Sequence, residues 1–148
     1  MIPTFLSNGN LPQGIHETTW KQFCRRFGHT AYRKSLIGRL AAALKELSAA
    51  GCREVYIDGS FVTAKEVPGD YDICWSIDNV IPEKLDPVLL DFSPNGRDIM
   101  KEKYKGDLFP AEIPEGISGK LFLDFFQTDK ITGEQKGIIA LEIGGFDD

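Results

Sequence analysis

Cysteine and histidine are scarce in this sequence, and long hydrophobic runs are absent. The three cysteines are scattered and form no Cys-x-x-Cys pair, which argues against a disulfide scaffold or a zinc site and for reduced thiols. Without a run of about 18 apolar residues, a membrane span is not expected. Residues 1–9 lack the basic flank and apolar centre of a signal peptide, so we expect a cytoplasmic protein with no membrane partner.

Motifs of two common enzyme classes are missing as well. There is no Gly-x-x-x-x-Gly-Lys followed by Ser or Thr, which excludes a P-loop, and no Gly-x-Ser-x-Gly nucleophile turn. The two histidines, His16 and His29, have no serine or cysteine motif around them. Serine or cysteine hydrolase chemistry is therefore a poor explanation for this chain.

Charge is unevenly distributed along the chain. The net charge is −5, yet residues 1–45 contain seven Lys or Arg and a single acid, Glu17. Such asymmetry is typical of a patch for an anionic partner, or of two helices with solvated basic faces, and both interpretations stay open. The overall acidity argues against non-specific binding to duplex nucleic acid.

Length and composition bound the architecture. At 148 residues, with 42% apolar and 26% charged residues, the chain is expected to form one domain over 1–148. We divide it into an N-terminal arm with helices (1–50) and a sheet core (51–148). Helices come first and strands then mix with helices, which predicts an α+β fold with a mixed sheet of about five strands.

Periodicity and turn residues place the elements. An irregular arm is expected over 1–15, and helices are expected over three segments: 17–27, Thr30 to about Ala50, and Ser93-Pro94 to Gly106. Strands are expected over five runs: 54–58, 71–77, 108–113, 121–127 and 138–143. The run 121–127 is apolar on both faces, so we expect a central strand there, followed by a hairpin turn at 129–133.

The pattern richest in chemistry lies between residues 55 and 72. An apolar strand breaks at Gly59-Ser60, and Asp70 and Asp72 open the next extended run. Because side chains two residues apart on a strand share a face, the two carboxylates are expected to project together, where they suit Mg²⁺ or Mn²⁺. The Gly-Ser turn offers N–H groups and a hydroxyl to phosphate, although turn chemistry alone also explains Asp after Pro-Gly. Together, the two carboxylates and the Gly-Ser turn are suited to hold a metal-bound nucleoside triphosphate.

Gly59-Ser60, nine intervening residues and Asp70-Tyr71-Asp72 resemble the signature of the DNA polymerase beta-like nucleotidyltransferase superfamily. The wider chain is similar to a bacterial family of small uncharacterised nucleotidyltransferase-like proteins, over four segments: 11–16, 50–72, 107–112 and 122–127. The resemblance implies Mg²⁺-dependent transfer of a nucleoside monophosphate from a triphosphate to a hydroxyl of RNA, protein or a small molecule. It also implies a toxin–antitoxin context.

A third carboxylate belongs to the pattern that the resemblance implies, and the sequence offers two. Asp124 lies within an apolar run, where an unpaired charge is unfavourable unless it meets a partner or a metal, so we favour it as third metal ligand and base. Asp107 precedes another apolar run, but it also reads as the end of a helix beside Gly106. Four further residues are expected to hold the phosphates: Gly59, Ser60, Thr63 and Lys65.

Two other functions compete with an enzyme. One is a binding module of the same fold that holds a nucleotide or a partner without turnover. The other is an interaction protein whose basic helices contact an acidic or RNA partner through Arg33 and Lys34. The nucleotide, the acceptor and the oligomeric state are left open by the sequence.

Overall fold

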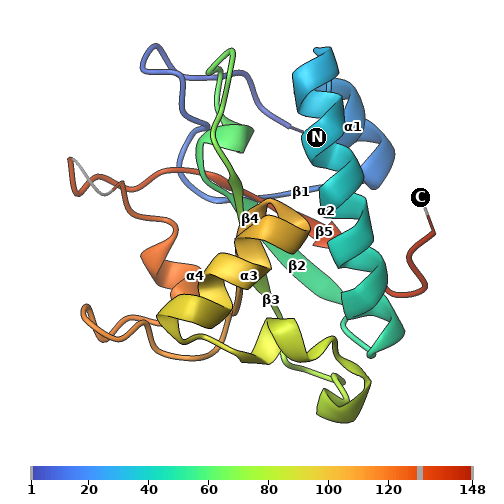
Figure 1. Cartoon of the computed structure of the whole chain (residues 1–148). Coiled ribbons are helices and arrows are strands. Elements are labelled where there is room, and N and C mark those ends of the chain that lie inside the picture. The colour runs from blue at the N-terminus through green and yellow to red at the C-terminus, as the bar shows by residue number, and fades with distance from the viewer. Residues whose placement is uncertain (1, 130–131, 148) are drawn as a thin grey trace.

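A computed structural model of the chain describes residues 2–129 and 132–147. Within them a five-stranded mixed sheet packs against helices, which confirms the α+β prediction (Figure 1). The strands are β1 (Ile15–Thr18), β2 (Glu54–Asp58), β3 (Tyr71–Trp75), β4 (Gly106–Pro110) and β5 (Ile138–Glu142). The helices are α1 (Trp20–Phe27), α2 (Ala31–Ala49), α3 (Pro94–Tyr104) and α4 (Phe122–Phe125), with 3₁₀ turns η1 (Ser60–Val62), η2 (Pro82–Lys84) and η3 (Pro87–Leu90).

The strand order across the sheet is β1-β5-β2-β3-β4. β1 and β5 are parallel, β3 and β4 are parallel, and β2 runs antiparallel to both of its neighbours. The connection from β3 to β4 crosses over through η2, η3 and α3, so both strands begin at the same edge of the sheet. That edge brings the start of β3 next to the start of β4.

Alternation along the strands separates two faces. One face contributes eight residues to the main core: Val55, Ile57, Tyr71, Ile73, Trp75, Leu108, Ile139 and Leu141. Helices α1, α2 and α3 cover that face, and their buried residues belong to the same cluster. The opposite face contributes Cys74 and Phe109 to a smaller cluster with Phe126, just after α4. In Figure 1, α1 and α2 lie to the right of the sheet and α4 lies to its left.

Local signals explain helices α1 and α2. The side-chain oxygens of Thr19 and Thr30 accept hydrogen bonds from the N–H groups of Gln22 and Arg33, which caps each helix at its first turn. Four buried leucines form the inner stripe of α2: Leu36, Leu40, Leu44 and Leu47. The prediction of the second helix is confirmed, whereas α1 begins at Trp20 rather than at residue 17.

The starts of β3 and β4 are locked together. Tyr71 is fully buried, and its hydroxyl donates a hydrogen bond to the carbonyl oxygen of Tyr104. A Cβ at Gly106 would lie 2.5 Å from the Tyr71 carbonyl oxygen, so only glycine fits there. Helix α3 ends with Lys105 in the left-handed conformation (φ 62°), and Gly106 already belongs to β4 rather than stopping the helix. The residues that follow, Asp72 and Asp107, are thereby held in fixed register.

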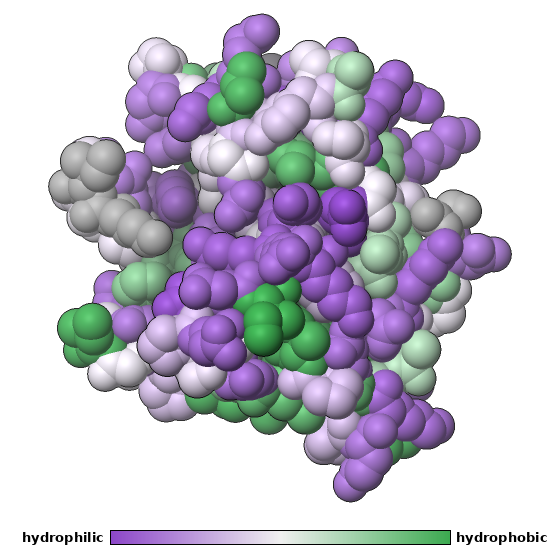
Figure 2. Space-filling model, viewed as in Figure 1, coloured by the Kyte–Doolittle hydropathy of each residue, from purple (hydrophilic) through white to green (hydrophobic). Residues whose placement is uncertain are grey.

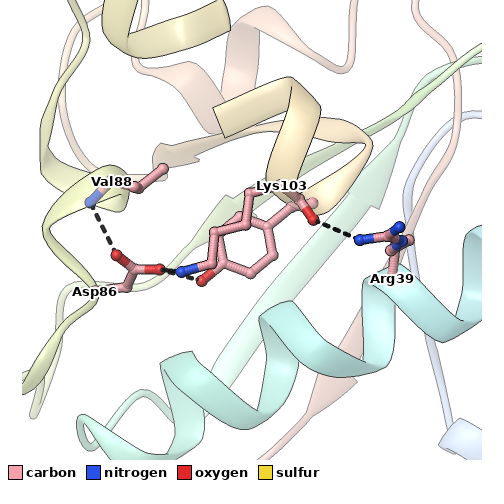
Figure 3. Close-up of polar contacts among 5 residues, drawn as sticks. Arg39, Asp86, Val88 and Lys103 are labelled. Carbon is pink, nitrogen blue, oxygen red and sulfur yellow. Dashed lines mark hydrogen bonds and ion pairs between the residues drawn. The ribbon is translucent and has the colours of Figure 1, made fainter. Parts of the chain in front are cut away.

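A polar cluster ties α3 to its neighbours (Figure 3). Asp86, just before η3, accepts hydrogen bonds from the Val88 N–H (3.1 Å), the Tyr104 hydroxyl (2.6 Å) and the Lys103 ammonium. The guanidinium of Arg39 in α2 donates to the Lys103 carbonyl oxygen at 3.2 Å. Burial by itself raises the pKa of Asp86, but the three hydrogen bonds outweigh burial and lower the pKa below its usual value.

Replacing Asp86 with asparagine is expected to lower the free energy of unfolding by about 1 kcal/mol at pH 7, because the charge-assisted bonds weaken. The folded pKa is depressed, so this stabilisation is present above the unfolded pKa of about 4 and is lost as the pH falls below it. Urea unfolding of both proteins at pH 7 and pH 3 measures the difference. An equal difference at both pH values would contradict the assignment.

The apolar run 121–127 is not a central strand. Residues Phe122–Phe125 form the short helix α4, in which the Phe125 N–H donates to the Leu121 carbonyl oxygen. Phe122 and Phe126 are four residues apart and therefore lie on one helical side, stacked against Phe109 of β4. The run reads as apolar on both strand faces because three phenylalanines pack inward from one helical turn.

The hairpin predicted at 129–133 is only partly testable, because residues 130 and 131 lie outside the described ranges. An isolated antiparallel bridge pairs Thr128 with Gln135, but the turn does not join two strands, since α4 precedes it.

The prediction of an irregular arm over residues 1–15 is wrong at the last residue of the arm. Ile15–Thr18 form β1 at the edge of the sheet, so the N-terminal segment contributes to the sheet core.

The view in Figure 2 shows a largely hydrophilic face with separate hydrophobic patches. Cys24, Cys52 and Cys74 form no disulfide bond, and burial raises the pKa of Cys52 to about 11. Among the described helices, none combines the length and the apolar character needed to cross a membrane.

Candidate functional site

Three aspartates form a row across β2, β3 and β4. Asp58 lies opposite Asp72 in the antiparallel β2–β3 pair, and Asp72 lies beside Asp107 in the parallel β3–β4 pair. Residues paired across adjacent strands project to the same side of a sheet, so the three carboxylates share the face that α4 covers. Asp58 is only 2% exposed and Asp107 only 8%. Buried carboxylates this close together require cations nearby.

The ends of this row are paired with basic side chains. Lys136 lies 3.3 Å from Oδ1 of Asp58, and Arg97 and Lys101 of α3 each lie 3.5 Å from Oδ2 of Asp107. The buried Oδ1 of Asp107 has no hydrogen-bond partner among the described residues. An unsatisfied carboxylate oxygen next to Asp72 is a place for a cation or for a donor on a ligand.

The chemistry of these carboxylates suits a magnesium ion, for which they would supply part of the ligand set. Mg²⁺ is usually held by one or two carboxylates, with waters and substrate phosphates as its other ligands. Asp72 and Asp107, which are neighbours in the sheet, would provide the two carboxylates. Within residues 2–129 and 132–147, no group of three or more His, Cys, Asp or Glu residues is arranged to hold a metal.

Gly59 brings the loop after β2 against the carboxylates. Its φ of +89° lies in the region that favours glycine, and a Cβ at this position would lie 2.9 Å from Oδ2 of Asp72. Any other residue would therefore strain the backbone and push the Asp72 carboxylate away. Asp72 therefore lies next to the Gly-Ser turn, as predicted.

Arg33 holds the loop from inside the protein. The sequence predicts that Arg33 faces outward, either toward an anionic partner or toward solvent, but Arg33 is completely buried. Its guanidinium donates hydrogen bonds to the carbonyl oxygens of Phe27 (3.2 Å), Phe61 (2.8 Å), Thr63 (3.0 Å) and Lys65 (2.6 Å). Burial lowers the pKa of Arg33, an effect that nearby Glu66 partly offsets. Arg33 is therefore unable to contact a partner, which removes half of the predicted Arg33–Lys34 contact.

The predicted phosphate-binding hydroxyls also shape this loop. Ser60 Oγ accepts a hydrogen bond from the Gly69 N–H at 3.1 Å, which joins the two ends of the segment. Thr63 Oγ1 donates to the Ser60 carbonyl oxygen at 2.6 Å and accepts from the Lys65 N–H at 3.2 Å. Among the described residues, Ser60 Oγ donates no hydrogen bond, so its proton can reach a ligand, whereas the Thr63 hydroxyl is committed to the turn.

Three hollows adjoin one another around these groups. The first, which we call the lysine hollow, has a volume of about 540 Å³ and lies between the N-terminal arm and the loop. Seven of its lining residues are polar: Ser7, Asn8, Asn10, Ser60, Thr63, Lys65 and Lys136. The central hollow, of about 280 Å³, shares Ser60 and Lys136 with it and adds Asp58 and Asp72. The aromatic hollow, of about 340 Å³, is lined by Asp72 and Asp107 and by five phenylalanines: Phe92, Phe109, Phe122, Phe125 and Phe126.

Two predicted carboxylates lie apart from these hollows. Asp70 is exposed, directly before β3, and lines none of the three. Asp124 is exposed on α4 and also lines none of them. The reason for favouring Asp124, a buried position inside a strand, is therefore wrong. Asp107, the other candidate, lies in β4 beside Asp72 and does not merely end a helix.

Several residues of the site were not anticipated. Asp58 ends β2 directly before Gly59 and lies opposite Asp72. Antiparallel pairing of the two strands predicted at 54–58 and 71–77 would have revealed this position. Lys136 reaches Asp58 from a segment distant in sequence, whereas Arg97 and Lys101 reach Asp107 from α3, the helix just before β4. No local spacing marks these three basic residues.

The fold and the site together define a small α+β protein with a carboxylate row beside a glycine loop held in place by a buried arginine. The chain belongs to DUF6932, a family of unknown function, whose match covers residues 3–142. Neither a curated protein nor a solved structure matches the chain.

Proposed function

We propose that this protein is a small Mg²⁺- or Mn²⁺-dependent nucleotidyltransferase, which transfers a nucleoside monophosphate from a nucleoside triphosphate to a hydroxyl of RNA, protein or a small molecule. One observation supports this most strongly: Asp72 and Asp107 lie side by side at the edge where Gly59 packs against Asp72. Positioning and neutralisation of charge account for most of the catalysis of phosphoryl-type transfer, and this edge offers both.

The triphosphate is placed along the lysine and central hollows. Lys65 and Lys136 line the lysine hollow and offset phosphate charge there, while Ser60 offers its hydroxyl proton at the boundary between the two hollows. Arg33 keeps the loop in shape from behind, through backbone carbonyls rather than through the ligand. The α-phosphate then lies nearest to Asp72.

A divalent cation held by Asp72 and Asp107 would supply charge neutralisation to the triphosphate oxygens. The remaining chemistry falls to the chain itself. The acceptor oxygen bonds to the α-phosphorus, the bond from that phosphorus to the bridging oxygen breaks, and pyrophosphate leaves. Asp107 Oδ1, which lacks a partner among the described side chains, takes the proton of the attacking hydroxyl. Asp70 precedes β3 and lies outside the three hollows, so no part of this step is assigned to it.

The test is transfer of α-phosphate label from each of the four nucleoside triphosphates, with Mg²⁺ or Mn²⁺ and with RNA, protein or small-molecule acceptors. Replacing Lys65 with methionine is expected to weaken triphosphate binding about tenfold, because one charge-assisted contact is lost. Lys120→Met is the matched control, since Lys120 is exposed and lines none of the three hollows. Equal binding by the two variants would argue against the lysine hollow as the phosphate site.

A binding module without turnover is the second candidate, and one observation favours it. Arg97 and Lys101 both lie 3.5 Å from Asp107 Oδ2, where they compete with a metal for that carboxylate. The same assay separates the two functions. Triphosphate binding with label transfer supports the enzyme, and triphosphate binding without transfer to any acceptor supports the module.

A further inference from the structure

Five of the ten phenylalanines of the chain line the aromatic hollow. They come from the segment before α3, from β4, and from α4 with the residue that follows it: Phe92, Phe109, Phe122, Phe125 and Phe126. Packed protein interiors leave few voids larger than a water molecule. A hollow of about 340 Å³ walled by aromatic rings is therefore more than a satellite core, and its size lies in the range of small-molecule sites.

Three of the five rings of this hollow share a common orientation. Phe109 and Phe122 are stacked with their planes 3° apart and their centroids at 4.5 Å, and Phe126 lies within 24° of both planes. Phe92, at the outer end, is 40% exposed and lies 5.9 Å from Phe109. A flat ligand ring that enters the hollow meets faces already aligned for stacking.

Polar groups are placed at the edge of the same hollow. The guanidinium of Arg97 lies 5.2 Å from the centroid of the Phe109 ring and lines the hollow together with Asp107 and Glu115. Arginine supplies donors, and the two carboxylates supply acceptors. A flat heteroaromatic ring with both donors and acceptors on its edge matches this combination, whereas an aliphatic or purely apolar ligand leaves the polar groups unpaired.

The position of the hollow limits what it receives. Asp72 lines both the aromatic and the central hollow, and the central hollow shares Lys136 with the lysine hollow. A molecule with a flat ring at one end and phosphate at the other would span from the phenylalanines to the lysines and pass the carboxylates on the way.

We propose that the aromatic hollow binds a nucleobase, stacked on the phenylalanine wall with its edge toward Arg97 and the carboxylates. This inference rests on the proposed function and extends it by naming the chemistry of a second part of the substrate. The base belongs either to the donor triphosphate or to a nucleotide-bearing acceptor. Stacking on aromatic rings contributes strongly to binding of a base and tolerates different bases.

The experiment is calorimetric titration of the full chain with four probes in Mg²⁺ buffer: adenosine, ATP, inorganic tripolyphosphate and a short single-stranded adenine oligonucleotide. The variant Phe122→Leu keeps apolar volume and removes the ring face, and Phe92→Leu at the exposed rim is a second variant with little effect on packing. Phe146→Leu is the control, because Phe146 packs on Trp20 and not in the hollow.

Both test variants are expected to weaken adenosine binding about 5- to 100-fold while tripolyphosphate binding stays unchanged. Weaker ATP binding identifies the donor base as the occupant, and weaker oligonucleotide binding with unchanged ATP binding identifies the acceptor base. The inference is overturned if the unmodified protein binds no base-bearing probe, or if the test variants bind adenosine as tightly as Phe146→Leu does.

Failure of the proposed function has a separate signature. If adenosine binds through Phe122 but neither tripolyphosphate binding nor label transfer is found, the base site stands and the transferase proposal falls. If tripolyphosphate binds and label is transferred while Phe122→Leu changes no affinity, the reverse conclusion follows.

Discussion

Replacing Arg33 with methionine is expected to lower the free energy of unfolding by about 3 kcal/mol or more. The guanidinium satisfies four backbone carbonyl oxygens, two of them on residues flanking the glycine loop, Thr63 and Lys65. Methionine fills part of the volume but donates no hydrogen bond, so these acceptors are left partly unpaired. Chemical denaturation followed by circular dichroism measures the loss.

Lys34→Met is the matched control for this change. Lys34 is the next residue of α2, is exposed, and carries the same charge, so its loss is expected to change the unfolding free energy by less than about 0.5 kcal/mol. Arg33→Lys is an intermediate case, because an ammonium cannot reach four carbonyls spread around a planar guanidinium. Equal stability of Arg33→Met and Lys34→Met would show that the buried arginine does not hold the loop.

Replacing Asp72 with asparagine is expected to reduce nucleotidyl transfer by about 1000-fold or more, the largest effect on activity of any change considered. Asp72 lies at the centre of the aspartate row and lines the central and aromatic hollows, so its charge lies where the proposed α-phosphate is closest to the protein. Loss of one preorganised charged group at a transfer site typically lowers the rate by about 100- to 1000-fold, and a shared metal ligand adds to that.

The companion variants decide between the two candidates for the third carboxylate. Asp107→Asn is expected to lower transfer by about 100-fold or more, as for loss of a general base, whereas Asp124→Asn leaves it unchanged because Asp124 is exposed on α4. Initial rates of label transfer measure this, and melting temperatures confirm that the variants are folded. If Asp124→Asn loses activity and Asp107→Asn keeps it, then Asp124 and not Asp107 is the third carboxylate.

Local patterns were sufficient for much of the fold. Helix α2 has a threonine cap and a leucine stripe, and β2 and β3 begin and end close to their predicted positions, because cap, periodicity and turn residues lie within a few positions of one another. The run 121–127 was misread for a physical reason. Three phenylalanines on one helical turn occupy both faces of an imagined strand, so strand alternation cannot be told from a single short turn.

The site was anticipated where its parts lie near one another in sequence and not where they come from afar. Gly59 and Asp72 belong to one hairpin-like segment, and the structure places them in contact. The choice between Asp107 and Asp124 depended on whether the neighbour of β3 in the sheet is β4 or a later strand, which is a property of topology. Arg33 was misplaced because burial of a guanidinium depends on carbonyls 28 to 32 residues away.

The position of β5 has a consequence for how the chain reaches its native state. β5 is inserted between β1 and β2, pairing Ile138 with Ile15 on one side and Leu141 with Val55 on the other. During synthesis, therefore, β1 waits without a partner until residue 142 has been made. Pairings of such large sequence separation slow folding, because the intervening chain must be ordered first. The nascent protein is expected to spend that interval with the β5-facing edge of β2 unpaired.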